Sequence, residues 1–202
     1  MWTAGAAAVA ALSLLLFFWL AYATYNGATR SLDSVLRDLA HSLAAPLVTS
    51  LMRQVTAIGG YEFLIPLVIV SAAYLVKTER RRDAAFFATG AAAGELFEQV
   101  FKHSLRRARP EAFFGLESPA TFSFPSGHAL MSCIIYGMLA AAITTQLRDR
   151  MARGLVWAGA AGLIGAIGFS RVYLGMHWPT DVIGGYSLGV AWLVALRAFW
   201  RQ

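Results

Sequence analysis

Long runs of apolar residues, separated by short polar and charged clusters, dominate the pattern of this 202-residue chain. A helix needs about 20 mostly apolar residues to cross the hydrocarbon layer of a bilayer, so each run is a candidate membrane span. A shorter run that contains Pro66 ends sharply at a basic cluster beginning with Lys77, and proline is tolerated in membrane helices. The pattern predicts six spans, over residues 6–22, 61–76, 84–100, 129–145, 155–169 and 182–200.

The first run also resembles a secretory signal, because Ala21, Tyr22 and Ala23 are similar to a cleavage site. However, no Lys or Arg precedes the run, and its apolar stretch is longer than a usual signal core. We therefore expect this segment to be retained as a span.

Residues 31–58 have a different pattern, in which apolar residues recur at helical spacing with charged residues between them. Pro46 divides the segment into two amphipathic pieces. Helices of this kind lie in the membrane interface or pack across a bundle. The predicted fold is therefore all-α, a six-transmembrane-helix bundle with amphipathic interfacial helices between the first and second spans. We expect residues 1–202 to form a single domain.

Composition agrees with a membrane protein, since 58% of the residues are hydrophobic and only 14% are charged. The net charge of +6 does not indicate nucleic-acid binding, because the basic residues flank apolar spans, where charge sets topology. Cys133 is the only cysteine, which excludes an intrachain disulfide.

Basic residues are divided almost evenly between the two ends of the predicted bundle. The side shared by both termini has nine: Lys77, Arg80, Arg81, Arg82, Arg148, Arg150, Arg153, Arg197 and Arg201. The other side has eight: Arg30, Arg37, Arg53, Lys102, Arg106, Arg107, Arg109 and Arg171. If Lys102, Arg109 and Arg171 are kept there for chemistry, the comparison becomes nine against five. Positive loops favour the cytoplasm, so we predict cytoplasmic termini.

Glycines recur at short spacing within several predicted spans: Gly90, Gly94, Gly159, Gly162, Gly165, Gly168, Gly184, Gly185 and Gly189. Small residues let helices approach closely, either within one bundle or between two copies. We expect packing within the bundle, and a monomer or weak homodimer.

Three polar segments fall on the same side of the six-span bundle, at residues 102–110, 125–128 and 170–181. Lys102, Arg109 and Arg171 are three cations suited to a group with at least two negative charges, since arginine forks match phosphate oxygens and lysine acts as a point charge. Ser126 and Gly127 lie at a predicted helix N-terminus, where free N–H groups favour an anion. No cluster has the ligand spacing of a metal site, so we expect no metal and no cofactor.

Two histidines suit complementary roles beside this phosphate site. Asp181 follows His177 by four residues, so its carboxylate can hold one ring nitrogen and leave the other free to attack. His128 can protonate the leaving alkoxide and afterwards activate water.

These segments resemble the three-part signature of the phosphatidic acid phosphatase type 2 superfamily, Lys-x6-Arg-Pro, Pro-Ser-Gly-His and Ser-Arg-x5-His-x3-Asp. Every signature position is filled: Lys102, Arg109, Pro110, Pro125, Ser126, Gly127, His128, Ser170, Arg171, His177 and Asp181. Any one motif alone is weak, but all three in order within a six-span chain are specific.

The resemblance implies a phosphohistidine intermediate, no metal requirement and an outward-facing site. It implies that His177 is the nucleophile, Asp181 its orienter and His128 the general acid. The phosphate ligands would be Lys102, Arg109, Arg171, Ser126 and Gly127. The small size is most similar to bacterial members that act on phosphatidylglycerophosphate or undecaprenyl diphosphate. We therefore expect a bacterial cytoplasmic membrane enzyme with a phospholipid or polyprenyl phosphate substrate, in contact with membrane lipids.

Several residues outside the signature have alternative interpretations. Glu98, one turn before Lys102, has three possible states: it pairs with that lysine, forms another buried hydrogen bond, or stays neutral. The role of Glu95 is open. Four phenylalanines either line a lipid path or anchor a loop: Phe113, Phe114, Phe122 and Phe124. His103 is interpreted as interfacial, and Arg106 and Arg107 as a solvated basic face.

Other functions are open to the same motifs. A phosphotransferase would pass the phosphate from histidine to a lipid or sugar acceptor instead of water. A non-catalytic lipid-binding protein should lack a nucleophile or a cation, and this chain lacks neither. A transporter often has internal repeats around a midplane site, whereas the polar groups here cluster at one surface.

Overall fold

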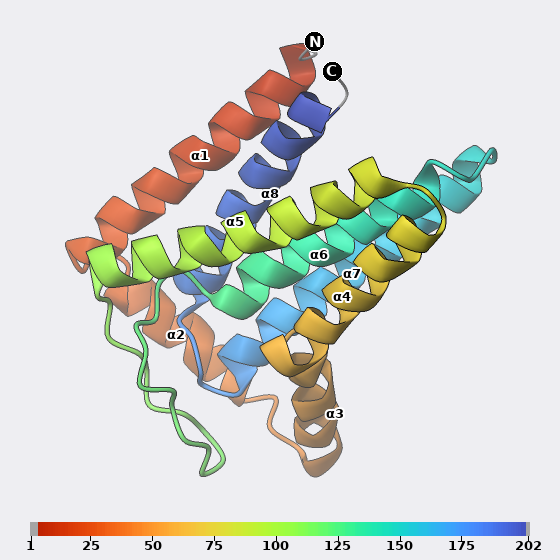
Figure 1. Ribbon diagram of the computed structural model, residues 1–202. Coiled ribbons are helices and arrows are strands. Elements are labelled where there is room, and N and C mark those ends of the chain that lie inside the picture. Colours follow the sequence, from red (N-terminus) through yellow and green to blue (C-terminus); the bar gives the residue numbers. More distant parts are fainter. Residues whose placement is uncertain (1–3, 201–202) are drawn as a thin grey trace.

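Each long apolar run of the sequence lies within a helix of the computed structural model, which describes residues 4–200 except for the Trp200 side chain. The helices are α1 (Ala4–Tyr25), α2 (Arg30–His41), α3 (Pro46–Ala57), α4 (Tyr61–Lys77), α5 (Arg81–Leu105), α6 (Gly127–Thr144), α7 (Arg150–Tyr173) and α8 (Pro179–Trp200). No strand occurs within residues 4–200. The predicted all-α class is confirmed (Figure 1).

Four helices, α1, α6, α7 and α8, are long and apolar enough to cross a membrane. The helices α3 and α4 meet this condition only together, as a pair bent by 42°. Helix α5 contains the predicted span 84–100 but is less apolar, because Glu95, Glu98 and Gln99 interrupt it. By length and composition the described chain therefore has four or five candidate spans, and the count of six stays a prediction.

Helix α6 occupies the centre of the bundle, where it packs against α5, α7 and α8. Most of its residues are buried, and they join a core with side chains from α1, α4, α5 and α8. Close approach of α8 depends on Gly185, where a Cβ would lie 2.7 Å from the carbonyl oxygen of Ser126. This contact places α8 directly beside the start of α6.

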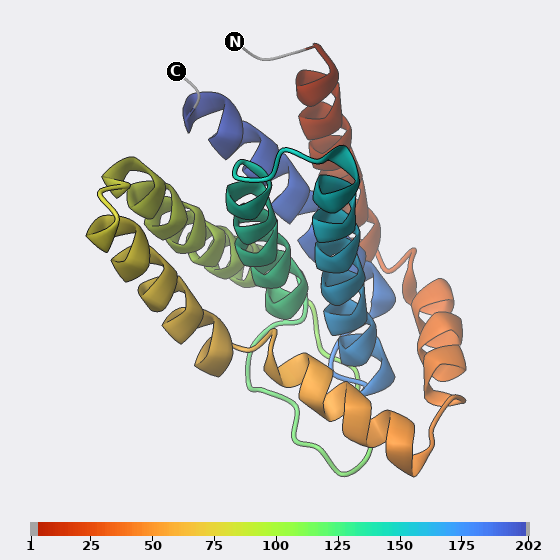
Figure 2. The same cartoon turned by 90° about the vertical axis from the view of Figure 1, so that its right-hand side faces the viewer.

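Helix α1 lies along α8 and places Phe17 and Leu20 in the common core, so the first apolar run is part of the bundle. Helix α1 starts and α8 ends at the same end of the molecule, together with the α4–α5 and α6–α7 turns (Figure 2). Helices α2 and α3 and the long α5–α6 connection lie at the opposite end. Arg201, counted above among the charges near the termini, lies outside the described residues.

The expectation that the glycines pack within the bundle is correct for part of the set. A Cβ at Gly90, Gly94 or Gly189 would meet side chains of α6 within 3.0 Å. The expectation is wrong for Gly159, Gly162 and Gly165, whose added Cβ atoms meet nothing within 4 Å. These three lie on the outward side of α7, because only the opposite side of that helix faces the bundle.

Candidate active site

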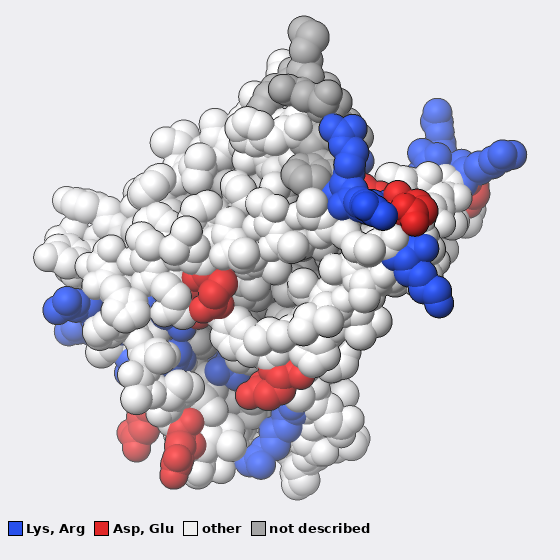
Figure 3. Space-filling model, in the orientation of Figure 1, with Lys and Arg blue, Asp and Glu red and all other residues white. Residues whose placement is uncertain are grey.

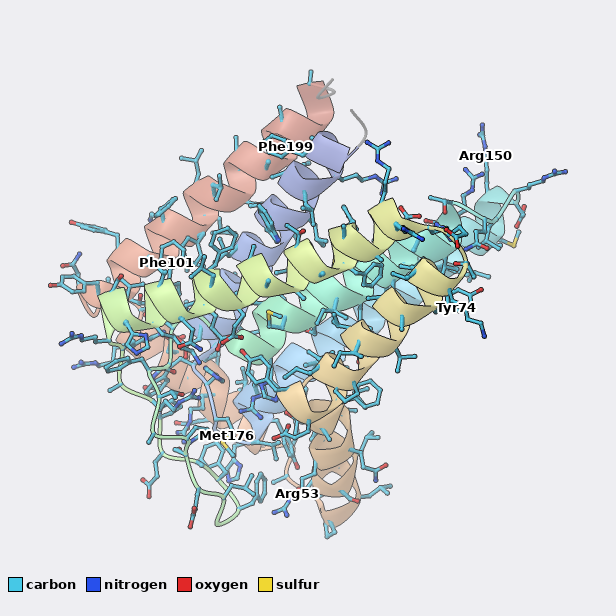
Figure 4. All side chains as sticks on the ribbon, viewed as in Figure 1. Arg53, Tyr74, Phe101, Arg150, Met176 and Phe199 are labelled. Atoms are coloured by element: carbon cyan, nitrogen blue, oxygen red, sulfur yellow. The ribbon has the colours of Figure 1, made fainter. Side chains whose placement is uncertain are left out.

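The three polar segments of the sequence converge at the end of the molecule that carries α2 and α3. They lie at the end of α5 and in the connection that follows it, at the start of α6, and across the α7–α8 junction. Figure 4 labels Met176, directly before His177, at this end, and Arg150 at the far end of the molecule. The helices therefore bring together residues that are up to 79 positions apart, from Lys102 to Asp181.

His177 and Asp181 form a fully buried pair at the start of α8. His177 Nδ1 lies 3.3 Å from Asp181 Oδ2, as expected for residues one helical turn apart. The same carboxylate oxygen accepts hydrogen bonds from the Trp178 backbone N–H, at 2.9 Å, and from the Ser123 hydroxyl. Asp181 is thus held in an orientation in which Oδ2 can accept a hydrogen bond from Nδ1–H of His177.

The other ring nitrogen of His177 faces Arg109. Arg109 Nη1 lies 2.9 Å from His177 Nε2 and also donates to the Met176 carbonyl oxygen. A guanidinium group only donates, so Nε2 must present its lone pair there, and the ring proton belongs on Nδ1. Burial lowers the pKa of His177 well below its usual range, and the neighbouring cations Arg109, Arg171 and Lys102 lower it further. The lowered pKa favours a neutral imidazole, whose free electron pair on Nε2 is directed at the guanidinium group of Arg109.

Two further cations are buried nearby and held by short contacts. Lys102 Nζ pairs with Glu98 Oε1 at 2.7 Å, and the other oxygen of Glu98 accepts from the Tyr61 hydroxyl at 2.6 Å. Of the alternatives left open for Glu98, the structure shows the pair with Lys102. Arg171 Nη1 donates to Thr56 Oγ1 at 2.8 Å. Buried cations in such number favour an anionic ligand, because each otherwise loses hydration without full compensation.

The start of α6 contributes backbone and hydroxyl groups. Ser126 is its N-cap residue, but the Ser126 side chain makes no capping hydrogen bond. Ser126 Oγ and Arg171 Nε are buried polar atoms with no hydrogen-bond partner among the described residues. A Cβ at Gly127 would collide with the Glu98 carboxylate, 2.2 Å away, so only glycine fits between the two helices here. Free donors at a helix N-terminus are suited to phosphate oxygens.

His128 follows in the first turn of α6 and borders the same space. Its electrostatic neighbours are Arg171, His177, Lys102 and Arg109. On its other side the ring approaches the α3–α4 turn, where a Cβ at Gly60 would lie 3.6 Å from Nε2. All eight predicted site residues are thus gathered at one place, with two histidines on its border.

The interpretation of Arg107 as a solvated basic residue is wrong. Its side chain is only 13% exposed and bridges two fully buried carboxylates, Asp33 of α2 and Asp181. Sequence reasoning also missed Ser123 and Asp33. The position of Asp33 away from the leucines of an amphipathic helix was the sequence feature that could have indicated its role. In the structure Asp33 is buried, whereas Leu32, Val35 and Leu39 are exposed.

The phenylalanines of the α5–α6 connection divide between different surroundings. Phe124 is fully buried in the main core, so neither expected role applies to it. Phe113 stacks on His41 with ring centroids 3.7 Å apart, and Phe114 stacks on Tyr173. His103 is exposed and lies near Phe122.

An apolar cavity of about 430 Å³ opens between α4, α5 and α6 beside the site. Its lining is almost entirely hydrocarbon, with Leu64, Ile65 and Met131 among the contributing residues. Tyr61 lines the cavity and also donates to Glu98, so the apolar space reaches the partner of Lys102.

Comparison with known proteins gives a consistent result. A family model described as the PAP2 superfamily matches residues 83–202. Phosphatidylglycerophosphatase B of Bacillus subtilis is 32% identical over 189 residues, which cover 93% of this chain and 93% of that protein. An undecaprenyl-diphosphatase of Sulfolobus acidocaldarius is 36% identical over 102 residues, 47% of this chain and 44% of that protein.

Among solved structures, a transmembrane PAP2-type phosphatidylglycerolphosphate phosphatase from Bacillus subtilis superposes with a TM-score of 0.86 at 29% identity, over 94% of each chain. The resemblance inferred from the three motifs is confirmed. This chain belongs to the PAP2 superfamily and is a membrane-embedded lipid phosphatase.

Proposed function

We propose that this chain hydrolyses a phosphate monoester or diphosphate on a membrane lipid, without a metal ion, through a phosphohistidine at His177. The observation that carries this proposal is the arrangement of His177 between Asp181 and Arg109. One ring nitrogen faces a carboxylate, and the other faces a guanidinium of the kind that binds phosphate oxygens.

In the first step, Lys102, Arg109 and Arg171 bind the phosphate oxygens, with Ser126 Oγ and the N–H groups at the start of α6. His177 Nε2 attacks phosphorus, and the bond from phosphorus to the lipid oxygen breaks. Asp181 stabilises the positive charge that develops on the imidazole, and His128 gives a proton to the departing oxygen.

In the second step, His128 takes a proton from water as the water oxygen attacks phosphorus. The bond from phosphorus to Nε2 then breaks and inorganic phosphate is released. His177 returns to its neutral form and His128 to its protonated form. The three cations stabilise the charge on the equatorial oxygens in both steps, the part that metal ions play in other phosphoryl-transfer sites.

We propose undecaprenyl diphosphate or phosphatidylglycerophosphate as the substrate, which is what the named relatives act on. The apolar cavity beside the Glu98–Lys102 pair suits the hydrocarbon chain of such a lipid. A panel assay tests this point, measuring phosphate release from phosphatidate, phosphatidylglycerophosphate, undecaprenyl monophosphate and diphosphate, and lipid A. A glycerol or sugar acceptor added to the same assay would reveal phosphotransfer, as a phosphorylated acceptor in place of free phosphate.

The mechanism is tested by His177→Ala, with the exposed His103→Ala as the matched control. We expect activity in EDTA, inhibition by vanadate, and loss of turnover by a factor on the order of 10⁴ or more in His177→Ala. Brief incubation with labelled substrate should trap an acid-labile, alkali-stable phosphoprotein in the wild type only. Full activity of His177→Ala would disprove the mechanism.

For topology we propose six spans, with α4 and α5 completing the bundle, and α2 and α3 in the outer interface. The exposed leucines on α2 support an interfacial position, because the polar face of this helix is turned toward the protein. The termini would be cytoplasmic and the site extracytoplasmic. Glu117→Cys, on the site side, should react with an impermeant thiol reagent outside intact cells, and Arg148→Cys only after lysis. The buried Cys133 should not interfere; the reverse labelling pattern would invert the orientation.

A further inference from the structure

Neither Arg107 nor Asp33 occupies a defined position of the three motifs, yet Arg107 binds the buried Asp181 carboxylate beside His177, and Asp33 binds Arg107. We propose that they are positioning residues for the reaction: Arg107 holds the Asp181 carboxylate in the orientation that fixes the His177 tautomer, and Asp33 holds Arg107. This inference rests on the proposed function of His177 as the nucleophile.

The two oxygens of Asp181 have different partners. Oδ2 serves the reaction side, where it meets His177 Nδ1, the Ser123 hydroxyl and the Trp178 N–H. Oδ1 accepts from Arg107 Nη1. A carboxylate turns about one bond, so a partner on Oδ1 limits where Oδ2 can point. Arg107 therefore fixes the carboxylate from Oδ1, while Ser123 and Trp178 hold Oδ2, the oxygen that accepts the hydrogen bond from Nδ1–H.

Charge gives a second reason for this role. Asp181 is fully buried, and an isolated buried carboxylate is costly to keep ionised. Arg107 supplies a permanent positive charge in direct contact. If Asp181 were protonated, it would accept the Nδ1 proton poorly, and His177 would lose its preferred tautomer. Arginine suits the position because its planar guanidinium group can donate to Asp181 with one nitrogen and to Asp33 with the other.

Arg107 is itself held from the other side. Its Nη2 donates to Asp33 Oδ2 at 2.6 Å and lies 3.3 Å from Thr29 Oγ1. Asp33 also accepts from the Thr180 backbone N–H at 3.0 Å and from the Thr180 hydroxyl at 2.8 Å. Thr180 directly precedes Asp181, so Asp33 caps the first turn of α8 from another helix. The network joins α2, the α5–α6 connection and the start of α8 into one unit around Asp181.

A purely structural role is the competing explanation, in which the network only attaches α2 to the bundle. The two roles differ in their kinetic effect. The proposed phosphate ligands do not include Arg107 or Asp33, so loss of positioning should lower kcat and leave KM nearly unchanged. Loss of attachment should lower the folded fraction, while the folded molecules turn over normally.

The test measures kcat and KM for dioctanoyl phosphatidate in detergent micelles, per mole of monodisperse protein. Asp33→Asn keeps the shape of the side chain and removes its charge; we expect kcat to fall about tenfold with KM within about twofold. Arg107→Ala should lose about 100-fold in kcat, and Arg107→Lys, which keeps the charge but reaches fewer partners, should lie between Arg107→Ala and the wild type. The matched controls are Asp38→Asn, an exposed aspartate of α2, and Arg106→Ala, the exposed neighbouring arginine; both should equal the wild type.

Chemical rescue of kcat distinguishes the two roles, because a residue that only attaches α2 to the bundle should show no rescue. Guanidinium ion at millimolar concentration should raise kcat of Arg107→Ala several-fold and leave Arg106→Ala unchanged. If Arg107→Ala does not fold, Asp33→Asn and Arg107→Lys still decide the question. Folded Asp33→Asn and Arg107→Lys with wild-type kcat, while His177→Ala is inactive, would overturn the inference and leave the proposed function intact. An active His177→Ala would instead overturn the proposed function.

Discussion

The two ends of this helical bundle carry similar numbers of basic residues and use them differently. At the α4–α5 and α6–α7 turns the basic side chains project into the surroundings, as the blue groups at the upper right of Figure 3 show. Arg81, Arg82 and Arg150 are all exposed there. At the site end, Lys102 and Arg171 are buried, and Arg107 is nearly so. The burial of the basic side chains and their hydrogen-bond partners, more than their number, distinguish a chemical site from basic residues that set membrane orientation.

The arginines at the two ends of α7 test this difference within one helix. Arg171→Ala removes a buried donor from the proposed phosphate site, so kcat/KM should fall by about 10²–10³-fold. Arg150→Ala, at the exposed start of the same helix, should leave kcat/KM unchanged. Initial rates of phosphate release from micellar substrate measure both. Equal losses in the two variants would contradict the contrast between the ends.

The acidic residues of α5 offer a second matched comparison. Glu98 pairs with Lys102 inside the bundle, whereas Asp83 pairs with Arg80 in a half-exposed position. Glu98→Gln should raise KM about tenfold by loosening a phosphate ligand. It should also lower the free energy of unfolding by about 1–3 kcal/mol, because a buried ammonium loses its charged partner. Asp83→Asn should cost no more than about 1 kcal/mol. Substrate titration and thermal unfolding in detergent distinguish the two variants.

The same contrast between buried and exposed charges explains which site residues could be predicted from the sequence. The motif spacing predicted that His128, His177 and Asp181 lie together with the three cations. Fixed spacings along helices and at helix ends determine where these side chains are placed. It did not separate Arg107 from Arg106, since adjacent arginines look alike until the fold buries one of them. For Asp33, the amphipathic pattern indicated a polar face but not the partners that bury it, because these lie 74 and 147 positions away along the chain.

The positions of the helices could be predicted from the sequence, but which of them span the bilayer was harder to predict. Apolar periodicity located all eight helices to within a few residues, including the division at Pro46. Glu98, which pairs with Lys102, is one of the polar residues that lower the apolar character of α5, so a side chain held at the site also weakens the hydropathy signal of this span. Glycine spacing likewise predicted close packing at Gly90 but not the open side of α7.

The pH dependence of catalysis sharpens the comparison further. In the proposed mechanism His177 must be neutral to attack phosphorus, and burial together with the adjacent cations lowers its pKa. A lowered pKa keeps the imidazole neutral in more acidic solution, so the acid limb of kcat/KM should lie below the pH of about 6.5 at which ordinary histidine titrates. Arg109→Gln removes one of those cations and should move the limb upward by about one pH unit.

Arg82→Gln removes a charge from the opposite end and should not move the limb, since solvent and salt screen a distant exposed charge. The substrate phosphate titrates identically in the pH profiles of the wild type, Arg109→Gln and Arg82→Gln. Differences between the three profiles therefore arise from groups of the protein. A limb that stays in place in Arg109→Gln, or that moves equally in Arg82→Gln, would contradict the assignment to His177.

The smallest expected effect concerns the outward side of α7. Gly162 is exposed in the middle of this helix, and an added Cβ meets nothing within 4 Å. Gly162→Ala should raise the free energy of unfolding by about 0.4–1 kcal/mol, because alanine restricts the unfolded chain more than glycine does. The matched variant is Gly185→Ala, whose Cβ would press on the Ser126 carbonyl oxygen and should destabilise the protein and lower kcat. Thermal unfolding in detergent and the phosphatase assay measure both changes. Loss of stability in Gly162→Ala would mean that this side of α7 is packed against something, such as a second copy of the chain.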